Sequence, residues 1–548
     1  PGMRTERYDR FRTFDPTTPN PEAGGRLGAL VGVQARGERG LVRTDKTNIG
    51  PRLGAAYAFN NRTVVRAGIG LYYSPVLYGA GGGNEPTPGL IGYNTDLGTF
   101  SAGLQATRFL STYPPLPGVN PTGQFLGSNP LYFDENFRTG RTLQYSVDLQ
   151  RELPYNFVTS ISYIGSKADR QRSNFGRINA IPLNALRLGD AILTAPLNRI
   201  TAPTTPADVA FANAARSLAS SVGVTLPTSN NAVFTGFNGS VAGALRAFPQ
   251  YGTITNLFES EGESTYDSLR IRLERRFSNG IQAGFSYTAS RLITNAAEDL
   301  FGGGPLSGTL QNPYVDPEEL KIVSPNNPPH VFVTNFLIEL PFGKGRRFLN
   351  QGGVVNALFG GFQISGILRY QAGTPITVST DADRGFLNQD ITGFLGNLRP
   401  NLTGQPLALD NEVRVRVPSA PDRIRVLNRA AFSAPTVFAS GSVPALVVNG
   451  ALNSAYTQYY SDPNRFFGTA PAVITDFRSD PFFSEDLSVM KKTRFTENLT
   501  LELGAEFFNV FNRVRYGLLN TNFASPDFGT KELIERPRII QLRGRIIF

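Results

Sequence analysis

Apolar and polar residues alternate along several segments of about ten residues in this chain. In TVVRAGIGLYY (63–73), the positions on one face are Val65, Ala67, Ile69, Leu71 and Tyr73. A period of two predicts a β-strand with one apolar and one polar face. The pattern recurs eleven times and predicts strands at 52–59, 63–73, 142–151, 157–165, 266–277, 281–290, 330–340, 362–371, 486–495, 499–510 and 538–548.

The connections between these strands alternate between short and long. The short ones are 60–62, 152–156, 278–280 and 496–498, with a longer one at 341–361 in which VVNALF (354–359) predicts a short interfacial helix. A soluble β-sandwich is the alternative fold, but it gives no reason for every long connection to lie at one end. Outer-membrane barrels have short periplasmic turns and long outer loops, and only a closed sheet pairs all backbone groups in lipid. The pattern therefore favours an all-β, antiparallel transmembrane β-barrel.

The same parity assigns the loops and the two faces of the strands. We expect one barrel domain over 1–548, with extracellular loops at 1–50, 74–140, 166–263, 291–329, 373–485 and 511–536. The expected lipid-facing residues include Leu71, Ile271, Phe285, Leu503 and the terminal Phe548. The charged residues expected to face the lumen, where they would contact a plug or a polar solute, are Arg66, Asp148, Arg270, Arg272, Glu274, Arg369, Glu502, Glu506, Arg543 and Arg545.

Composition narrows the possible functions. The chain has 548 residues, 40% of them hydrophobic, with 57 Gly, 39 Pro, 40 Phe and 20 Tyr. No apolar run reaches the roughly 18 residues that a transmembrane helix needs. The net charge is +10, but no basic run or basic helix accompanies it, so we expect no nucleic-acid partner. With no Cys and only His330 as histidine, no catalytic, cofactor or metal constellation can be assembled, and we expect no enzyme.

Several stretches resemble the C-terminal barrel of Oar-like TonB-dependent outer-membrane receptors, which carry a carboxypeptidase-regulatory-like domain. They include RYDRFRTFDPTTPNP (7–21), NIGPRLGAAYAF (48–59), TYDSLRIRLERRFSNGIQAGFSYTASR (265–291), HVFVTNFLIELPFGKGRRF (330–348) and LGAEFFNVFNRVRYG (503–517), in the same order as in that family. The resemblance implies a 22-stranded barrel with a plugged lumen in the outer membrane of a Gram-negative (diderm) bacterium. It also implies a plug domain and a TonB box, and energy from the TonB–ExbB–ExbD system.

The eleven predicted strands are half of that number, so we expect this chain to be the C-terminal half of the barrel, without the plug and the first strands. The final strand ends on an aromatic residue, in partial resemblance to the signal that the barrel assembly machinery recognises. The expected function is a receptor or transporter that binds a ligand, not identified by the sequence, with its extracellular loops and moves it through the plugged barrel. The alternative is a surface structural or adhesion protein that uses the barrel as an anchor, because the combined loops are long.

Overall fold

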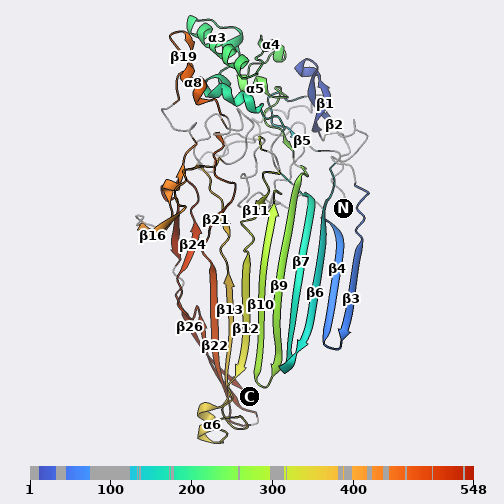
Figure 1. The fold of residues 1–548 in the computed structure, drawn as a ribbon, viewed down its shortest axis with the longest axis vertical. Helices are drawn as coiled ribbons and strands as arrows, with labels where there is room; N and C mark the ends of the chain where they lie inside the picture. Colours follow the sequence, from blue (N-terminus) through green and yellow to red (C-terminus); the bar gives the residue numbers. More distant parts are fainter. Residues whose placement is uncertain are drawn as a thin grey trace, which may run out of the picture.

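The computed structural model describes most of the chain in thirteen longer segments and four short ones (Figure 1). The described residues are 12–32, 45–74, 124–132, 134, 137–171, 173, 178–256, 259–296, 314–315, 318–380, 387, 398–415, 422–435, 443–462, 466–496, 498–534 and 537–548. Residues 1–11 and 75–123, which belong to the first two expected loops, lie outside them.

Eleven long strands form one antiparallel sheet, in which each strand pairs with the next long strand along the chain. The strands are β3 (Arg52–Asn60), β4 (Thr63–Ser74), β6 (Gly140–Leu153), β7 (Phe157–Gln171), β9 (Gly262–Ser278), β10 (Ile281–Thr294), β12 (His330–Glu339), β13 (Phe362–Gln371), β22 (Phe482–Arg494), β23 (Thr500–Phe508) and β26 (Ile539–Ile547). The short β11 (Ile322–Val323) adds to β10. The predicted antiparallel meander of eleven strands is confirmed, and β3 and β26 are its two edges.

All short connections lie at one end of this sheet, together with the C-terminus (Figure 1). They include the turn at 61–62, the 3-10 helix η4 (Pro154–Asn156), and the connection between β12 and β13 that contains helix α6 (Val354–Phe359). The long connections all leave from the other end. This separation is what the alternation of connection lengths predicts.

The sheet has two chemically different faces, and among the described residues no buried cluster packs against its apolar face. Four hydrophobic clusters are buried in the described residues, and none takes a member from the eleven strands. On the apolar face Leu53 is 74% exposed, Leu503 is 49% exposed and Leu542 is 80% exposed. A sheet of this size that leaves its apolar face uncovered needs an apolar solvent, because exposed apolar area in water is unfavourable.

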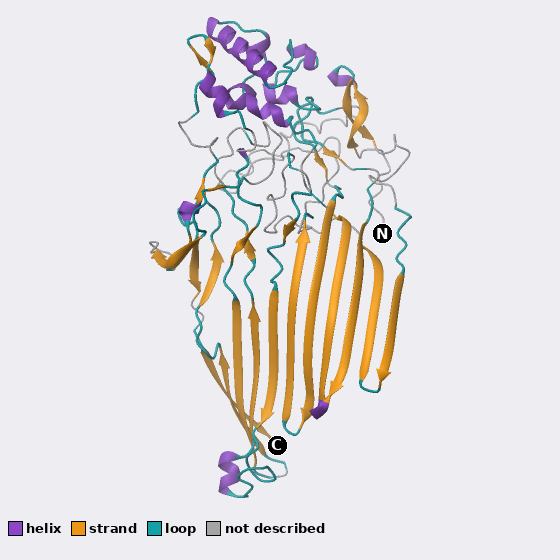
Figure 2. Ribbon diagram, in the orientation of Figure 1, coloured by secondary structure: helices purple, strands orange, loops and turns teal. Residues whose placement is uncertain are grey.

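The described parts of the long connections contain helices and short strands (Figure 2). Before β9 they contain β1 (Arg12–Asn20), η1 (Pro21–Ala23), β2 (Arg26–Gly32), β5 (Leu131–Tyr132), η5 (Leu183–Leu188), α1 (Gly189–Leu193), α2 (Asn198–Thr201), α3 (Pro206–Ser221), α4 (Asn230–Val233), α5 (Val241–Leu245) and β8 (Thr255–Asn256). After β13 they contain β14 (Pro375–Ile376), β15 (Asn401–Leu402), β16 (Ala408–Val415), β17 (Arg423–Leu427), η6 (Arg429–Ala431), β18 (Phe432–Ser433), β19 (Val447–Val448), β20 (Ala451–Leu452), α8 (Ser454–Tyr459), β21 (Ile474–Arg478), β24 (Arg515–Leu519) and β25 (Thr530–Ile534).

The largest buried core lies in what we call the apical helical module, residues 178–245 together with 443–462 and 466–467. Its longest helix, α3, starts with Thr205 as N-cap and Pro206 in the first turn, and the Thr205 hydroxyl accepts the Asp208 backbone N–H at 3.1 Å. The buried side of α3 repeats at helical spacing through Phe211, Ala214, Ala215 and Leu218. The Tyr456 hydroxyl donates to the Leu188 carbonyl at 2.8 Å, so two loops that are distant in sequence share this core.

Three smaller cores join the remaining long connections. The hairpin β1–β2 places Phe14 and Leu30 against Tyr251 and Ile254. Leu320 packs on Val473, and a further cluster combines residues of 376–432 and 474 with Phe528. Each described long connection therefore shares buried apolar surface with another one. Within the described residues, no helix is long and apolar enough to span a membrane.

Candidate functional site

Strand register places all ten charged residues expected in the lumen on one face of the sheet. Arg66 faces Asp148, Asp148 faces Ser162, and Ser162 faces Arg270 across successive strands. The same parity continues to the other edge, where Glu502 faces Arg545 and Gly504 faces Arg543. Directly opposed residues of an antiparallel pair lie on the same face, and we call this face the polar face. That it lines a lumen remains a prediction.

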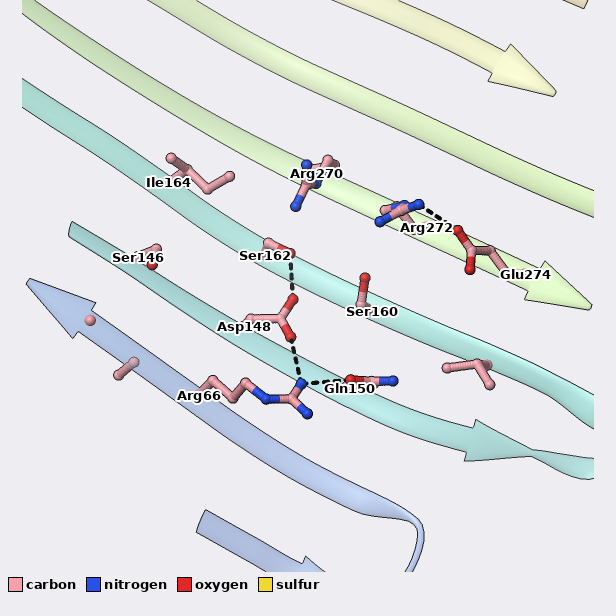
Figure 3. Close-up of a pocket in the computed structure, with 13 residues that line it drawn as sticks. Arg66, Ser146, Asp148, Gln150, Ser160, Ser162, Ile164, Arg270, Arg272 and Glu274 are labelled. Atoms are coloured by element: carbon pink, nitrogen blue, oxygen red, sulfur yellow. Dashed lines mark hydrogen bonds and ion pairs between the residues drawn. The ribbon is translucent and has the colours of Figure 1, made fainter. Parts of the chain in front are cut away.

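Five of the ten residues line one cavity of about 480 Å³ on β4, β6, β7 and β9 (Figure 3). The Arg66 guanidinium donates to Gln150 Oε1 at 2.6 Å and lies 3.8 Å from Asp148 Oδ1. Asp148 accepts the Ser162 hydroxyl through its other oxygen at 2.5 Å. Arg272 forms an ion pair with Glu274 two residues further along the strand. The cavity wall is a hydrogen-bonded row of charged and small polar groups.

Arg270 differs from the other charged residues of this cavity. Among the described residues it has no ion-pair partner, and its register neighbours are Ser162 and Thr288. Three arginines and two carboxylates line the cavity, so the wall carries one net positive charge. Exposed ion pairs of this kind add little stability, typically about 0–1 kcal/mol. The arrangement is therefore suited to polar recognition, and Arg270 is its unneutralised cation.

The other five expected residues do not join this cluster. Glu506 lines a separate cavity of about 310 Å³ with Asn335, Ser365, Asp486 and Ser488, and lies 3.7 Å from Arg543. The remaining contacts are local: Glu502 with Lys492 at 3.1 Å, Arg369 with Gln371 at 2.9 Å, and Arg545 opposite Glu502 in register. The expected charged residues thus line two separate cavities of the polar face.

The five residues expected to face lipid have the opposite parity. Ile271 faces Ile161 and Tyr287, and Phe285 faces Leu273. Leu71 faces Leu143, Leu503 faces Gly544, and Phe548, which follows the last strand, is 97% exposed. Their exposure to lipid itself stays a prediction.

Charged residues of the apolar face sit towards the strand ends. On β6, the apolar positions between Arg141 and Arg151 are Leu143, Tyr145, Val147 and Leu149. The ten residue steps from Arg141 to Arg151 rise roughly 34 Å along the strand, or about 26 Å across a bilayer at a tilt near 40°, which matches a band of about 25 Å. Towards the long-connection end, Asp267 accepts the Tyr163 hydroxyl. Aromatic rings beside a hydrogen-bonded charge are typical of a membrane interface.

The polar face also contains functional candidates that the sequence analysis did not select. Ser146, Gln150, Ser160 and Ser162 line the first cavity, and Asp486 lines the second. The parity of Ser160 and Ser162 was readable, because they alternate with Ile161 and Tyr163, but selecting charged residues left the uncharged ones out. Asp486 was missed although it is charged, because it is the first residue of its predicted strand. His330 stacks on Tyr287 with ring centroids 6.1 Å apart and Nδ1 2.9 Å from the tyrosine oxygen. In the described part of the chain, no three acidic or histidine side chains gather in a way that could hold a metal ion.

The sequence matches the profile of a protein family described as an outer membrane beta barrel domain, over residues 2–541. The chain belongs to the outer membrane β-barrel domain family. This domain resides in the outer membrane of Gram-negative bacteria, and its lipid is therefore a partner of the chain. No curated protein matches the sequence.

Solved structures similar to this outer membrane β-barrel domain are low in identity and longer. The outer membrane transporter YddB from Escherichia coli is 11% identical, with 90% of this chain and 40% of that chain covered and a TM-score of 0.38. The ferripyoverdine receptor of Pseudomonas aeruginosa bound to ferripyoverdine is 10% identical, with 90% and 32% covered and a TM-score of 0.33. The ferric citrate transporter FecA in its unliganded form is 8% identical, with 91% and 38% covered and a TM-score of 0.33. The chain spans 40% or less of the length of these proteins.

Proposed function

We propose that this chain is barrel sequence of a TonB-dependent outer-membrane receptor or transporter, which binds a ligand with its outer loops and passes it through a plugged lumen. The observation that carries the proposal is the width of the sheet. About eight strands close into a barrel that side chains can fill, whereas much larger barrels enclose water or a plug. Eleven strands already exceed that limit, so the lumen must hold something besides its own side chains.

The open edges of the sheet support the same proposal. In the described residues β3 and β26 each pair on one side only, and unpaired backbone groups in lipid cost several kcal/mol each. Further strands would complete the barrel, in agreement with the 22 strands that the family resemblance implies. The fuller barrel would carry the plug and the TonB box that contacts TonB–ExbB–ExbD.

In this proposal the polar face becomes the lumen wall. Arg270, without an ion pair in the described part of the chain, is the group most able to engage a carboxylate of the plug or of a passing solute, and Glu506 and Arg543 offer a second contact point. The long connections become the extracellular loops, and the apical helical module becomes the part that a ligand meets first. The ligand itself stays unidentified.

A surface adhesin anchored by the barrel is the second candidate. It is favoured by one specific observation, the shared cores that fuse the long connections into a folded superstructure. A folded superstructure can serve as a binding surface without any transport. The two functions differ in their need for energy, because only transport depends on TonB.

The test uses the full-length protein in cells with and without a functional TonB system. Cells would receive a mixture of peptides, saccharides and metal chelates, and depletion of each compound would be followed by mass spectrometry. Transport predicts that at least one compound disappears only when both the protein and TonB are present, and that Arg270→Glu slows its uptake while surface abundance stays unchanged. Surface attachment that is equal with and without TonB, without any depletion, would support the adhesin instead.

A further inference from the structure

The connection between β12 and β13, which we call the basal loop (341–361), differs from the other short connections. Those have two to five residues, whereas the basal loop has room for helix α6 and projects furthest at the short-connection end (Figure 1). Six of its large apolar side chains are exposed: Phe342, Phe348, Leu349, Val354, Leu358 and Phe359. Val354 and Leu358 lie one helical turn apart, and are 73% and 59% exposed. Such a concentration of exposed apolar groups indicates a binding surface.

The exposure is not the result of a loose chain, because hydrogen bonds hold the basal loop in one conformation. Asn356 Oδ1 accepts the Lys344 N–H at 2.8 Å, and Asn350 Oδ1 accepts the Gly345 N–H at 2.6 Å. At Gly361, φ is +71°, and a Cβ would lie 2.1 Å from the Lys492 carbonyl oxygen, so only glycine permits this close return to the sheet. The apolar side chains are therefore presented by a built structure.

All formal charges of the basal loop are positive. Lys344, Arg346 and Arg347 fall within it, and residues 340–361 contain no Asp or Glu. Arg346 reaches back to Glu339 at 2.6 Å, while Lys344 and Arg347 are exposed, and Arg347 lies 5.3 Å from the ring centre of Phe348. Next to the loop, Lys491 donates to the Gly360 carbonyl at 2.9 Å and lies 4.5 Å above the ring of Phe362. Apolar side chains with a rim of cations match an anionic membrane surface.

We propose that the basal loop inserts Val354, Leu358 and Phe359 into the lipid leaflet at the short-connection end, and that Lys344 and Arg347 bind the phosphates of anionic phospholipids there. The partner is a leaflet rather than a protein because the loop continues the apolar face of the sheet. Ile338, near the end of β12, faces Ile364, near the start of β13, and Phe362, two residues closer to the loop, lies on the same face. The proposal rests on the outer-membrane location and is independent of transport.

The absence of tryptophan from the whole chain permits a direct test. The full-length protein, with any tryptophan outside these 548 residues replaced by phenylalanine and with the added substitution Leu358→Trp, would be reconstituted in vesicles of phosphatidylcholine with and without phosphatidylglycerol, some lipids carrying brominated acyl chains. Val209→Trp, at an exposed position of α3, serves as the control outside the membrane. Leu542→Trp, on the apolar face of β26, serves as the control within it, and Val354→Trp replaces Leu358→Trp if that variant folds poorly.

The proposal predicts that the emission of the Leu358→Trp variant is blue-shifted and is quenched by bromine near the headgroup more than by bromine near the chain end. Brominated phosphatidylglycerol should quench it more than brominated phosphatidylcholine at equal mole fraction. Adding Lys344→Gln and Arg347→Gln should remove this preference, because each positive charge increases the association with anionic lipid about five-fold.

Two results would contradict the proposal. The insertion would be overturned if the Leu358→Trp variant emitted at the same long wavelength as the Val209→Trp variant and were equally unquenched. Equal quenching by both lipids, unchanged by the Gln variants, would overturn the role of the cations. Neither result depends on whether the protein transports a ligand.

Discussion

Substitution of Val147 by arginine tests the assignment of the two faces most directly. Val147 lies on the apolar face of β6, is 50% exposed, and sits six residues from Arg141 and four from Arg151. Four residues rise roughly 14 Å along the strand, or about 10 Å in depth at a tilt near 40°. The new guanidinium would therefore lie close to the middle of a hydrocarbon band of about 25 Å.

The expected loss in the free energy of unfolding is about 2–4 kcal/mol, the range for arginine near the bilayer midplane. Ser146 supplies the matched control, because it is the preceding residue, is also exposed, and points to the polar face between Gly68 and Ile164. Ser146→Arg adds the same side chain to water and should change stability by no more than about 0.5 kcal/mol.

The assay is reversible unfolding by guanidinium of the full-length protein in lipid vesicles, followed by the gel shift of the folded barrel. Both variants would be compared with wild type at the same lipid composition. A loss for Ser146→Arg as large as that for Val147→Arg would refute the assignment of the faces. A loss for Ser146→Arg alone would reverse it.

Three further changes test other parts of the molecule. Gly165→Ala should cost about 1–3 kcal/mol in the same assay, because its Cβ would lie 2.4 Å from the ring of Tyr145. Phe211→Ala should destabilise the apical helical module by about 3–5 kcal/mol, seen as a lower melting temperature of helical circular dichroism with an unchanged barrel gel shift. Burial raises the pKa of Tyr460 to about 12 and also raises the pKa of Tyr456. The stabilisation from these two neutral hydroxyls is complete below about pH 10 and is lost as the pH rises through the raised pKa values of the folded state. The helical circular dichroism should therefore be lost at a lower pH than the gel shift of the folded barrel. Tyr456→Phe should raise the pH at which half of the helical signal is lost.

The eleven strands were predictable because lipid imposes a simple rule on each of them. A strand between lipid and water alternates over most of its length, as β4 and β6 do. The strand ends were less predictable: β7 continues to Gln171 and β9 begins at Gly262, beyond the predicted 165 and 266. The two extensions pair with each other beyond the apolar band, where a lipid-facing alternation is no longer required.

The folded loops and the grouping of the site were not predictable from the strand pattern. Segments 166–263 and 373–485 were expected only as loops, yet α3 and α8 lie in a common core. That core depends on contacts such as Tyr456 with Leu188, 268 positions apart. The local alternation of apolar and polar residues contains no information about such a contact. Likewise, parity placed Arg66, Asp148 and Arg270 on one face, but only the register shows that they line one cavity and that Glu506 does not.

The shared core of the apical helical module restricts how this surface can be altered. One of its two segments connects β7 to β9 and the other connects β13 to β22. Each segment supplies buried residues that the other needs to form the core. A chimera that imports one segment from a related protein would expose half a core, whereas transfer of both together would preserve it. Antibodies or phages that recognise this surface would accordingly bind a discontinuous epitope. Its two segments would have to change together.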